Sequence, residues 1–332
     1  MKFTPSFVSA SAGLAAMLPA VLAAPTPTES DVVARAEVVK RASITDACDI
    51  GYASGTTGGA GGTTTTVSTY AQFTEAAALT GASVIVVSAP ITEAANQVKL
   101  TSDTTVVGTD SSVVLTGFGL LVKKMSNVII RNIGIKEVLA ANGDAIGVQY
   151  STQVWIDHVD VSSNRDHDKD YYDGLIDVTH ASDMVTISNS YIHDHWKASL
   201  VGHSDSNGDE DTGYLHLTYD SNYWQNINSR GPSFRFGTGH VINSYYLDCG
   251  DGINTRDGAQ MLVESNVFSG LSKPLYSTDS GYAVENDNDF GAGANAALAG
   301  TLTSISDYKY TLLGSANVVS SVTSSAGQTL SF

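Results

Sequence analysis

The sequence has no long run of apolar residues beyond its first two dozen positions. After residue 23, no segment offers the roughly 20 consecutive apolar side chains that a membrane-spanning helix needs. Basic residues are also scarce: 17 Lys and Arg stand against 34 Asp and Glu, and the formal net charge is −17. A charge this negative disfavours nonspecific binding to nucleic acid or to an anionic membrane. We therefore expect neither a nucleic acid nor a membrane as a partner.

Cysteine and proline are scarce as well. The two cysteines, Cys48 and Cys249, fit neither a metal motif nor a catalytic thiol, and their spacing leaves open one disulfide or two free thiols. No Asn-x-Ser/Thr sequon is present, which argues against N-glycans. Gly is abundant at 31 residues and only 15% of residues are charged, a composition typical of an extended, turn-rich β protein.

The first 41 residues predict a leader for export. A basic start followed by an apolar stretch with small residues at its end predicts a signal peptide over residues 1–23. Residues 24–41 are polar and end in Lys40-Arg41, a dibasic pair that predicts a propeptide. The mature chain would then be a single domain over residues 42–332, and we expect it to be secreted, extracellular and monomeric.

One sequence pattern recurs through the middle of the chain: apolar residues, then small polar residues, then a second apolar pair. Its copies are Val128-Ile-Ile-Arg-Asn-Ile-Gly-Ile135, Val154-Trp-Ile-Asp-His-Val-Asp-Val161, Val185-Thr-Ile-Ser-Asn-Ser-Tyr-Ile192, Leu217-Thr-Tyr-Asp-Ser-Asn-Tyr-Trp224 and Met261-Leu-Val-Glu-Ser-Asn-Val-Phe268, with a degenerate copy at 241–246. Aligning one residue per copy, namely Ile133, Val159, Ser190, Asn222, Ser244 and Asn266, gives steps of 26, 31, 32, 22 and 22 residues.

Repeats of this length without helical periodicity predict a stacked β-solenoid with three short strands per coil. The small polar residues at the aligned bend are expected to hydrogen-bond to neighbouring coils. Earlier segments fit the same picture, with strands predicted at 84–88, 104–107, 113–116 and 128–130 and a short helix after Thr69, over 70–79, as an N-terminal cap. An antiparallel sandwich is the less favoured alternative, because Asn-Gly hairpin signals are few.

Four segments resemble the pectate lyases of polysaccharide lyase family one. They are Val154-Trp-Ile-Asp-His158, Asp173-Gly-Leu-Ile-Asp177, His195-Trp-Lys-Ala-Ser-Leu-Val-Gly202 and Arg230-Gly-Pro-Ser-Phe-Arg235, which occur in the order of the family. The resemblance extends over roughly residues 48 to 270. It implies an all-β, right-handed parallel β-helix that cleaves de-esterified polygalacturonate by Ca²⁺-dependent β-elimination and so degrades plant cell wall pectin.

The resemblance also implies a calcium site. Asp144, Asp173 and Asp177 match the acidic ligands of the family, and Asn142 stands where many relatives carry a further Asp. Carboxylate and amide oxygens suit Ca²⁺, which takes six to eight oxygen ligands. On a straight strand Asp173 and Asp177 would lie about 13 Å apart, so we expect Gly174 to bend the chain between them.

Lys197 and Arg235 match the residues of the family that bind galacturonate carboxylates. Strand alternation would place Trp196, Ala198 and Leu200 in the core and Lys197 on the outside. In the same way, inward-facing Phe234 and Phe236 would leave Arg235 outward, where a guanidinium can grip a carboxylate with two hydrogen bonds.

Arg230 matches the proposed catalytic base, which takes the proton from C5 of the sugar. Free arginine is protonated at ordinary pH, so Lys197, Arg235 and Ca²⁺ nearby are expected to favour its neutral form, and an alkaline optimum follows. Calcium on the adjacent carboxylate would acidify the same proton.

Other candidate sites in the sequence have weaker support. His193 and His195 lack a third ligand, and the acidic stretch 205–211 lacks the Gly and closing Glu of a calcium loop. The three tryptophans, Trp155, Trp196 and Trp224, are expected in the core, and Tyr171 and Tyr172 are candidates for stacking on sugar. Alternative functions are a pectin lyase acting on methyl-esterified pectin and a noncatalytic pectin-binding β-helix.

Overall fold

The computed structural model describes Met1 and residues 42–332, and residues 42–332 form one compact unit. The predicted signal peptide and propeptide lie, Met1 apart, outside the described residues. In the described part, no helix is long and apolar enough to cross a membrane.

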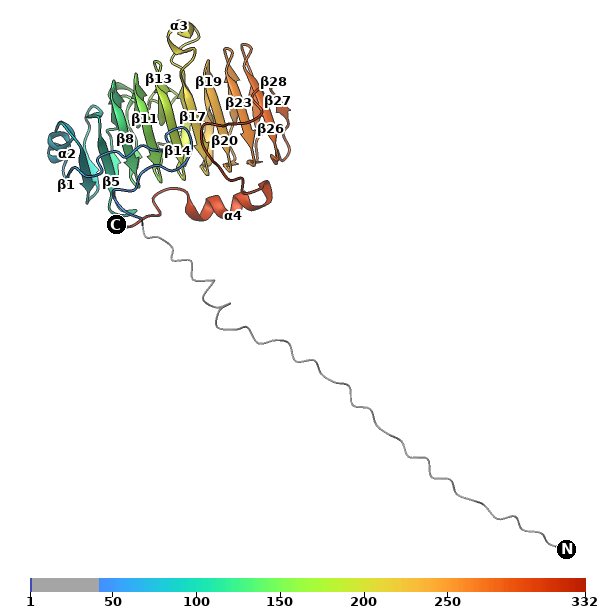
Figure 1. Cartoon of the computed structure of the whole chain (residues 1–332), viewed down its shortest axis with the longest axis horizontal. Helices are drawn as coiled ribbons and strands as arrows, with labels where there is room; N and C mark the ends of the chain where they lie inside the picture. Colours follow the sequence, from blue (N-terminus) through green and yellow to red (C-terminus); the bar gives the residue numbers. More distant parts are fainter. Residues whose placement is uncertain (2–41) are drawn as a thin grey trace. The chain divides into compact units, whose positions relative to one another are not determined.

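Three sheets run side by side along a coil, as Figure 1 shows, and every pairing between named strands is parallel. The largest sheet has 11 strands in the order β1 (Thr63–Val67), β2 (Ser83–Val87), β5 (Thr104–Gly108), β8 (Ser126–Arg131), β11 (Thr152–Asp157), β14 (Asp183–Ser188), β17 (His216–Asp220), β20 (Thr238–Ile242), β23 (Gln260–Glu264), β26 (Tyr282–Asn286) and β28 (Leu298–Ala299).

The second sheet has nine strands, which in chain order are β4 (Val98–Leu100), β7 (Leu120–Lys123), β10 (Ile146–Gln149), β13 (Ile176–Thr179), β16 (Leu200–Val201), β19 (Ser233–Arg235), β22 (Ile253–Arg256), β25 (Leu275–Ser277) and β27 (Asn295–Ala296). The third has eight: β3 (Ile91–Thr92), β6 (Val114–Thr116), β9 (Gly134–Lys136), β12 (Asp160–Ser162), β15 (Tyr191–Lys197), β18 (Tyr223–Ser229), β21 (Tyr245–Leu247) and β24 (Val267–Ser269). The all-β parallel solenoid predicted from the repeats is therefore confirmed.

The predicted repeat alignment matches the strand register. Val128 pairs with Val154, Val154 with Val185, and Val185 with Leu217, which are steps of 26, 31 and 32 residues. Because the pairing stays in register while the step changes, the extra residues are confined to the loops between strands.

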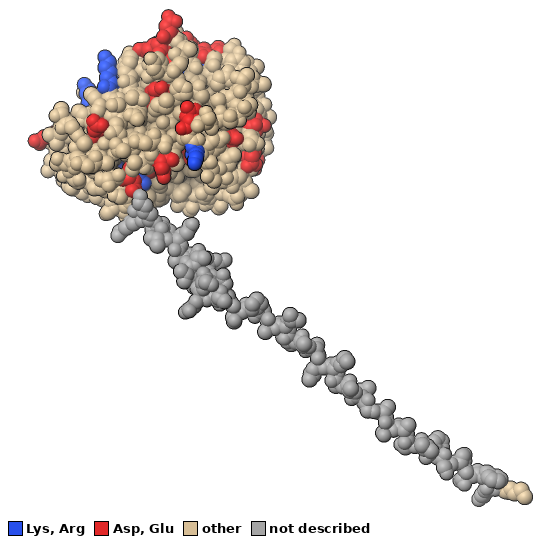
Figure 2. Space-filling view, in the orientation of Figure 1, with Lys and Arg blue, Asp and Glu red and all other residues tan. Residues whose placement is uncertain are grey.

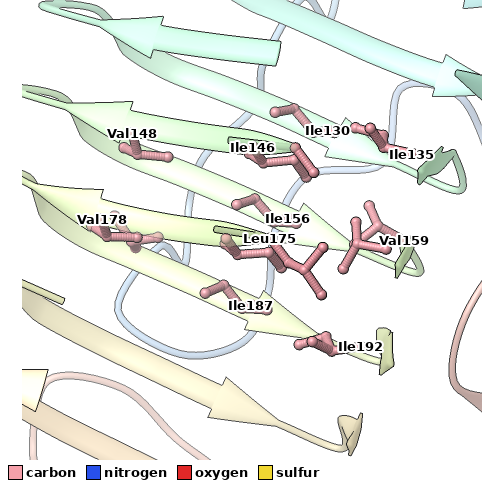
Figure 3. Packing of buried hydrophobic residues seen from close by; sticks show 14 of the residues in the cluster. Ile130, Ile135, Ile146, Val148, Ile156, Val159, Leu175, Val178, Ile187 and Ile192 are labelled. Carbon is pink, nitrogen blue, oxygen red and sulfur yellow. The ribbon is translucent and has the colours of Figure 1, made fainter. Parts of the chain in front are cut away.

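Inward-facing side chains of successive coils lie above one another. Ile130, Ile156 and Ile187 are fully buried at one position of three coils, and Figure 3 shows them in a row. Further along, the rings of Trp224, Tyr246, Phe268 and Phe290 stack 4.6–5.5 Å apart. Such stacks fill the interior of the coil with side chains.

The aligned polar bend forms the predicted ladder of hydrogen bonds. The backbone N–H of Ser190 donates to Asn222 Oδ1 at 3.0 Å, that of Asn222 to Ser244 Oγ at 3.2 Å, and that of Ser244 to Asn266 Oδ1 at 2.9 Å. The ladder continues to Asn288, a further member that the sequence comparison did not include, because the Asn266 N–H donates to its Oδ1 at 3.0 Å. These side chains satisfy backbone groups that the turn would otherwise bury unpaired.

Among residues 42–332, three α-helices lie outside the sheets. Helix α2 (Tyr70–Ala77) begins after Thr69, whose side chain accepts a hydrogen bond from the Gln72 N–H, and it buries Phe73. Helix α3 (Gly208–Asp211) lies in a loop after β16, and α4 (Ser315–Ser325) packs through Val318 and Val322.

Asp157 of the Val154–His158 segment belongs to an anchor for the start of the described chain. Its buried carboxylate accepts from Arg131 Nε at 2.8 Å, and Arg131 Nη1 donates to the Ser43 carbonyl at 3.2 Å and to Asp46 at 3.2 Å. Burial raises the pKa of Asp157, but the hydrogen bond and charge of His158 together with Arg131 outweigh it and leave the pKa below the ordinary value. The Val154–His158 segment therefore has a structural role, because its Asp157 holds Arg131, which anchors Ser43 and Asp46.

Both cysteines are free and buried. Cys249 lies in the interior cluster of the coil, whereas Cys48 packs outside it with Ala53, Ile129 and Trp155. The structure thus selects two thiols over a disulfide, and it places Trp155 under the N-terminal segment rather than inside the coil.

Candidate active site

Three carboxylates from two coils converge on one cavity. Asp144 follows the 3₁₀ turn η1 (Ala140–Asn142), Asp173 precedes β13, and Asp177 lies within β13. The cavity has a volume of about 320 Å³, and its lining residues are Asp144, Gln149, Asp173, Asp177, Thr179, Lys197, Leu200, His203 and Arg230.

Gly174 makes the approach of the carboxylates possible. Its N–H donates to Asp144 Oδ1 at 3.1 Å, and a Cβ at this position would lie 2.4 Å from Asp177 Oδ1. A side chain here would therefore displace the Asp177 carboxylate. The bend expected at Gly174 brings Asp173 and Asp177 to the same cavity.

The carboxylates of the cavity repel one another. Burial raises the pKa of Asp144 well above its ordinary value, and the charges of Asp177 and Asp173 raise it further. Burial likewise raises the pKa of Asp177, against the opposing charge of Arg230 and the N–H of Leu200. A cation bound near Asp144 and Asp177 would offset this unfavourable charge.

Lys197 lies at the end of β15 and reaches the cavity as predicted. Its Nζ is 2.9 Å from Asp170 Oδ1 and 4.0 Å from Asp173 Oδ1. The alternation that led to this prediction is wrong for two of its neighbours. Trp196 is only partly buried, donates to the His167 carbonyl and lies under Arg165, and Leu200 faces the cavity.

Leu200 lies on the next strand, after the chain has turned, and the reason for Trp196 is a left-handed residue within β15. Asp194 has φ 48°, and the left-handed conformation interrupts the two-residue alternation of side chains. As a result His195 turns inward and is 1% exposed, while Ala198 is buried as expected. His193 bonds Asp160 and Asp194 on the outer surface, whereas His195 bonds Ser163.

Arg230 lines the same cavity from the turn between β18 and β19. Its backbone is left-handed, with φ 67°. Its N–H donates to Asp251 Oδ1 at 2.9 Å, and the other oxygen of that carboxylate accepts from the Tyr276 hydroxyl at 2.7 Å. Side chains of the next two coils thus hold the main chain of Arg230.

Arg235 is not among the residues that line the cavity. It is 8% exposed and its Nε lies 2.6 Å from Asp205 Oδ1 and 3.3 Å from Asp257 Oδ2, so carboxylates of its own chain already contact it. The prediction that Phe236 points inward is wrong, because Phe236 has φ 59°, is only partly buried and packs near Gly208. Phe234 is fully buried, as expected.

Asn142 and the two predicted sugar-stacking tyrosines lie apart from the cavity lining. The Asn142 amide donates to the Gly117 carbonyl at 3.2 Å. Tyr171 is exposed and stacks on His167 with ring centroids 3.7 Å apart, and Tyr172 is 6% exposed. In the part of the chain that the structure describes, no group of three His, Cys, Asp or Glu residues is arranged tightly enough to qualify as a metal site as it stands.

The acidic stretch 205–211 forms ion pairs and hydrogen bonds with the rest of the protein. Asp205 contacts Arg235 and Arg256, and Asp211 is fully buried and accepts from the Ala181 N–H at 2.7 Å. These contacts tie the loop that carries α3 to the coil.

Sequence reasoning missed a column of rings along one edge of the cavity. Tyr150 and His180 each follow the last residue of a strand in the second sheet, and the Tyr150 and His180 rings stack 4.7 Å apart. His203 extends the column at 4.6 Å and lines the cavity. The recurrence of an aromatic ring just after successive strands was a signal in the sequence that could have revealed it.

Comparison with known proteins assigns this site to a family. A family profile described as pectate lyase matches residues 31–330. The chain belongs to the pectate lyase family. It is 64% identical over 329 residues to pectate lyase A of Aspergillus niger, covering 98% of each chain, and 64% identical over 335 residues to a probable pectate lyase A of Aspergillus fumigatus, covering 100% of each.

Solved structures agree with this assignment. The lyase superposes with a TM-score of 0.75 on the crystal structure of a Bacillus sp. N165 pectate lyase in complex with trigalacturonate, at 30% identity over 84% of this chain and 98% of that one. A pectate lyase variant from Xanthomonas campestris gives 0.73 at 26% identity, over 86% of this chain and all of that one. The lyase is therefore a polysaccharide lyase that cleaves pectate.

Proposed function

We propose that the lyase cleaves de-esterified α-1,4-polygalacturonate by Ca²⁺-dependent β-elimination at the cavity between Asp177 and Arg230. The observation that carries this proposal is the convergence of three carboxylates, Lys197 and Arg230 on one cavity. Hydrolysis of the same bond would need paired carboxylates around a water, whereas here the carboxylates share the cavity with the cations Lys197 and Arg230. The relative solved with trigalacturonate supports an anionic sugar chain as the ligand.

Asp144, Asp173 and Asp177 would hold the calcium ion. Their oxygens are the hard donors that Ca²⁺ takes, and their mutual repulsion favours a divalent cation among them. Three carboxylates leave coordination positions for water and for a substrate carboxylate. Asn142 could join this set only if its amide turned away from Gly117, so we assign it no direct role in the structure described.

Lys197 would bind the carboxylate of a galacturonate residue, and Arg230 would act as the base. Arg230 would accept the proton from C5 while the bond between C4 and the glycosidic oxygen breaks, which leaves a double bond between C4 and C5 and a proton to be supplied to the departing oxygen. Bound calcium would supply a Lewis acid to the carboxylate beside C5. Arg235 would support this site by fixing the Asp205 loop, and would contact substrate only if it exchanged Asp205 for a sugar carboxylate.

Purified protein incubated with polygalacturonate, with and without a calcium chelator, tests the proposal. The expected result is an unsaturated product that absorbs near-ultraviolet light and disappears with chelator. Saturated reducing ends would contradict elimination, and chelator-insensitive cleavage of methyl-esterified pectin would instead indicate a pectin lyase. Asp177→Asn should abolish turnover, while Asp209→Asn, an exposed acid of the α3 loop outside the cavity lining, should leave it unchanged.

Further proposals concern the chain as a whole. We propose a secreted, extracellular monomer released by cleavage after residues 23 and 41. We also propose right-handed winding, which parallel β crossovers take in about 98% of cases. Helix α2 would cap the N-terminal end of the core, as the full burial of Phe73 supports.

A further inference from the structure

Three lysines lie on the same sheet as the cavity, toward its N-terminal end. Lys99 is in β4, Lys123 ends β7 and Lys124 follows it, and all three are exposed. We call these three residues the basic end. Lys99 pairs in register with Leu121, Leu121 with Gly147, and Gly147 with Asp177, so Lys99 and Asp177 occupy one outward row.

A second row leads from the basic end to the cavity. Lys123 pairs with Gln149, and Gln149 pairs with Thr179. Gln149 and Thr179 both line the cavity. Because side chains at paired positions of parallel strands point to the same face, the Lys123 ammonium lies on the face that carries the site.

Among the described residues, none of the three lysines of the basic end forms an ion pair with a carboxylate. The ion pairs of the structure involve other cationic residues. Strands β4, β7 and β10 contain no Asp or Glu. Acidic residues outnumber basic ones 34 to 17 in the chain, and Figure 2 shows them spread over the surface that it presents. Three lysines without an ion-pair partner, on strands that carry no acidic residue, therefore stand out as a place for an anion.

The ring column joins the basic end to the cavity. Lys124 Nζ lies 5.4 Å from the centre of the Tyr150 ring, and the column continues from Tyr150 through His180 to His203. Lys124, Tyr150 and His180 have φ of 59°, 52° and 56°, so the same turn is repeated in successive coils. The ring spacings of 4.7 and 4.6 Å match the ~4.8 Å between strands. Glu210 also lies at this edge, where its carboxylate is paired with His180 at 2.9 Å. The edge thus runs from Lys124 to the cavity, and Glu210 on it is paired with His180.

We infer that the substrate cleft continues over β10, β7 and β4, and that the basic end binds carboxylates of galacturonate residues remote from the bond that is cleaved. This inference rests on the proposed function. Strand spacing puts Lys99 about 14 Å from Asp177, three strands away. Such a reach is accessible to a polymer and only partly to a short oligomer. Lysine acts as a mobile point charge, which suits carboxylates held without fixed geometry.

The test compares the Lys99→Ala variant, which removes the lysine farthest from the cavity, with the wild-type lyase on trigalacturonate and on long polygalacturonate. The lost contact is an exposed charge pair, so we expect KM for the polymer to rise about two- to fivefold, less at high salt. We expect kcat on the polymer, and both constants on trigalacturonate, to change less than twofold. Lys136→Ala, which removes an exposed charge from β9 in the third sheet, is the matched control.

The possible outcomes separate support for the inference from its refutation and from failure of the proposed function. A polymer-specific rise in KM that the Lys136 variant does not share supports the inference. Equal rises for both substrates, an equal effect of the control, or no change would overturn it. Failure of the wild-type lyase to form an unsaturated product from either substrate would instead refute the proposed function, so the two failures are distinct.

Discussion

The hydroxyl of Tyr276 should matter for catalysis although the residue lies two coils from Arg230. It donates at 2.7 Å to Asp251, whose other oxygen accepts the Arg230 N–H at 2.9 Å. Arg230 needs such support because a left-handed conformation costs a residue with a side chain about 1–2 kcal/mol. Tyr276→Phe keeps the ring and removes only the donor.

The magnitude follows from the charge of the acceptor. A hydrogen bond to a charged group contributes about 1.5–3 kcal/mol, so the free energy of unfolding should fall by about that amount in Tyr276→Phe. If the carboxylate shifts and Arg230 moves by a few tenths of an ångström, turnover should fall by about tenfold, since a displacement of 1 Å can cost ~100-fold. KM for polygalacturonate should change little, because Lys197 and the carboxylates stay in place.

Steady-state kinetics on polygalacturonate and denaturant unfolding measure both effects. Tyr282→Phe is a matched control, because it lies on β26 in another sheet and no hydrogen bond of its hydroxyl is found in the described residues. Wild-type kcat in Tyr276→Phe despite lost stability would refute the idea that Asp251 positions Arg230. A rise in KM with unchanged kcat would show instead that Tyr276 contacts the polymer.

Three further outcomes are expected. Burial raises the pKa of Cys48 and of Cys249 to about 12 each, so a thiol reagent should label neither in the native protein and both after unfolding; rapid native labelling would contradict their burial. Because the folded pKa of Asp157 is depressed, its stabilisation is present above the unfolded value of about 3.9 and is lost as pH falls below it. Asp157→Asn should therefore flatten acid unfolding in that range and destabilise the protein at neutral pH by about 3 kcal/mol, as circular dichroism would show. Asn222→Ala should cost about 2–4 kcal/mol of unfolding free energy by losing its bonds to Ser190 and Ile187; a cost under 0.5 kcal/mol would mean that water replaces them.

The sequence predicted the coil well because one physical requirement repeats in it. Each coil must bury apolar side chains at the same strand position and satisfy the same bend, so Val128, Val154 and Val185 could be aligned without coordinates. The predicted convergence of Asp144, Asp173 and Asp177 on one cavity with Arg230 has the same origin, since residues far apart in sequence recur at one corner of neighbouring coils.

The errors arise where single residues leave the strand conformation. Strand alternation misplaced Trp196, because Asp194 is left-handed, and it misplaced Phe236, because that residue is left-handed itself. It misplaced Leu200 because the chain turns between the end of β15 at Lys197 and the start of β16 at Leu200. The left-handed conformation recurs at Asn226 and Asp248, which take the place of Asp194 in the next two coils, so the repeat held a signal that alternation alone did not use. The contacts of Arg235 with Asp205 were also beyond reach, because they depend on the path of a loop that no repeat constrains.

The position of the site along the stack of coils affects how well the site resists local unfolding. Strands β13, β16 and β19, which carry or flank the cavity, stand in the middle of a sheet of nine. In a structure whose coils touch only their neighbours, local opening begins at the ends and spreads inward. Exchange of amide hydrogens should accordingly be slowest in these central strands, and several terminal coils could open transiently while the enzyme still turns over.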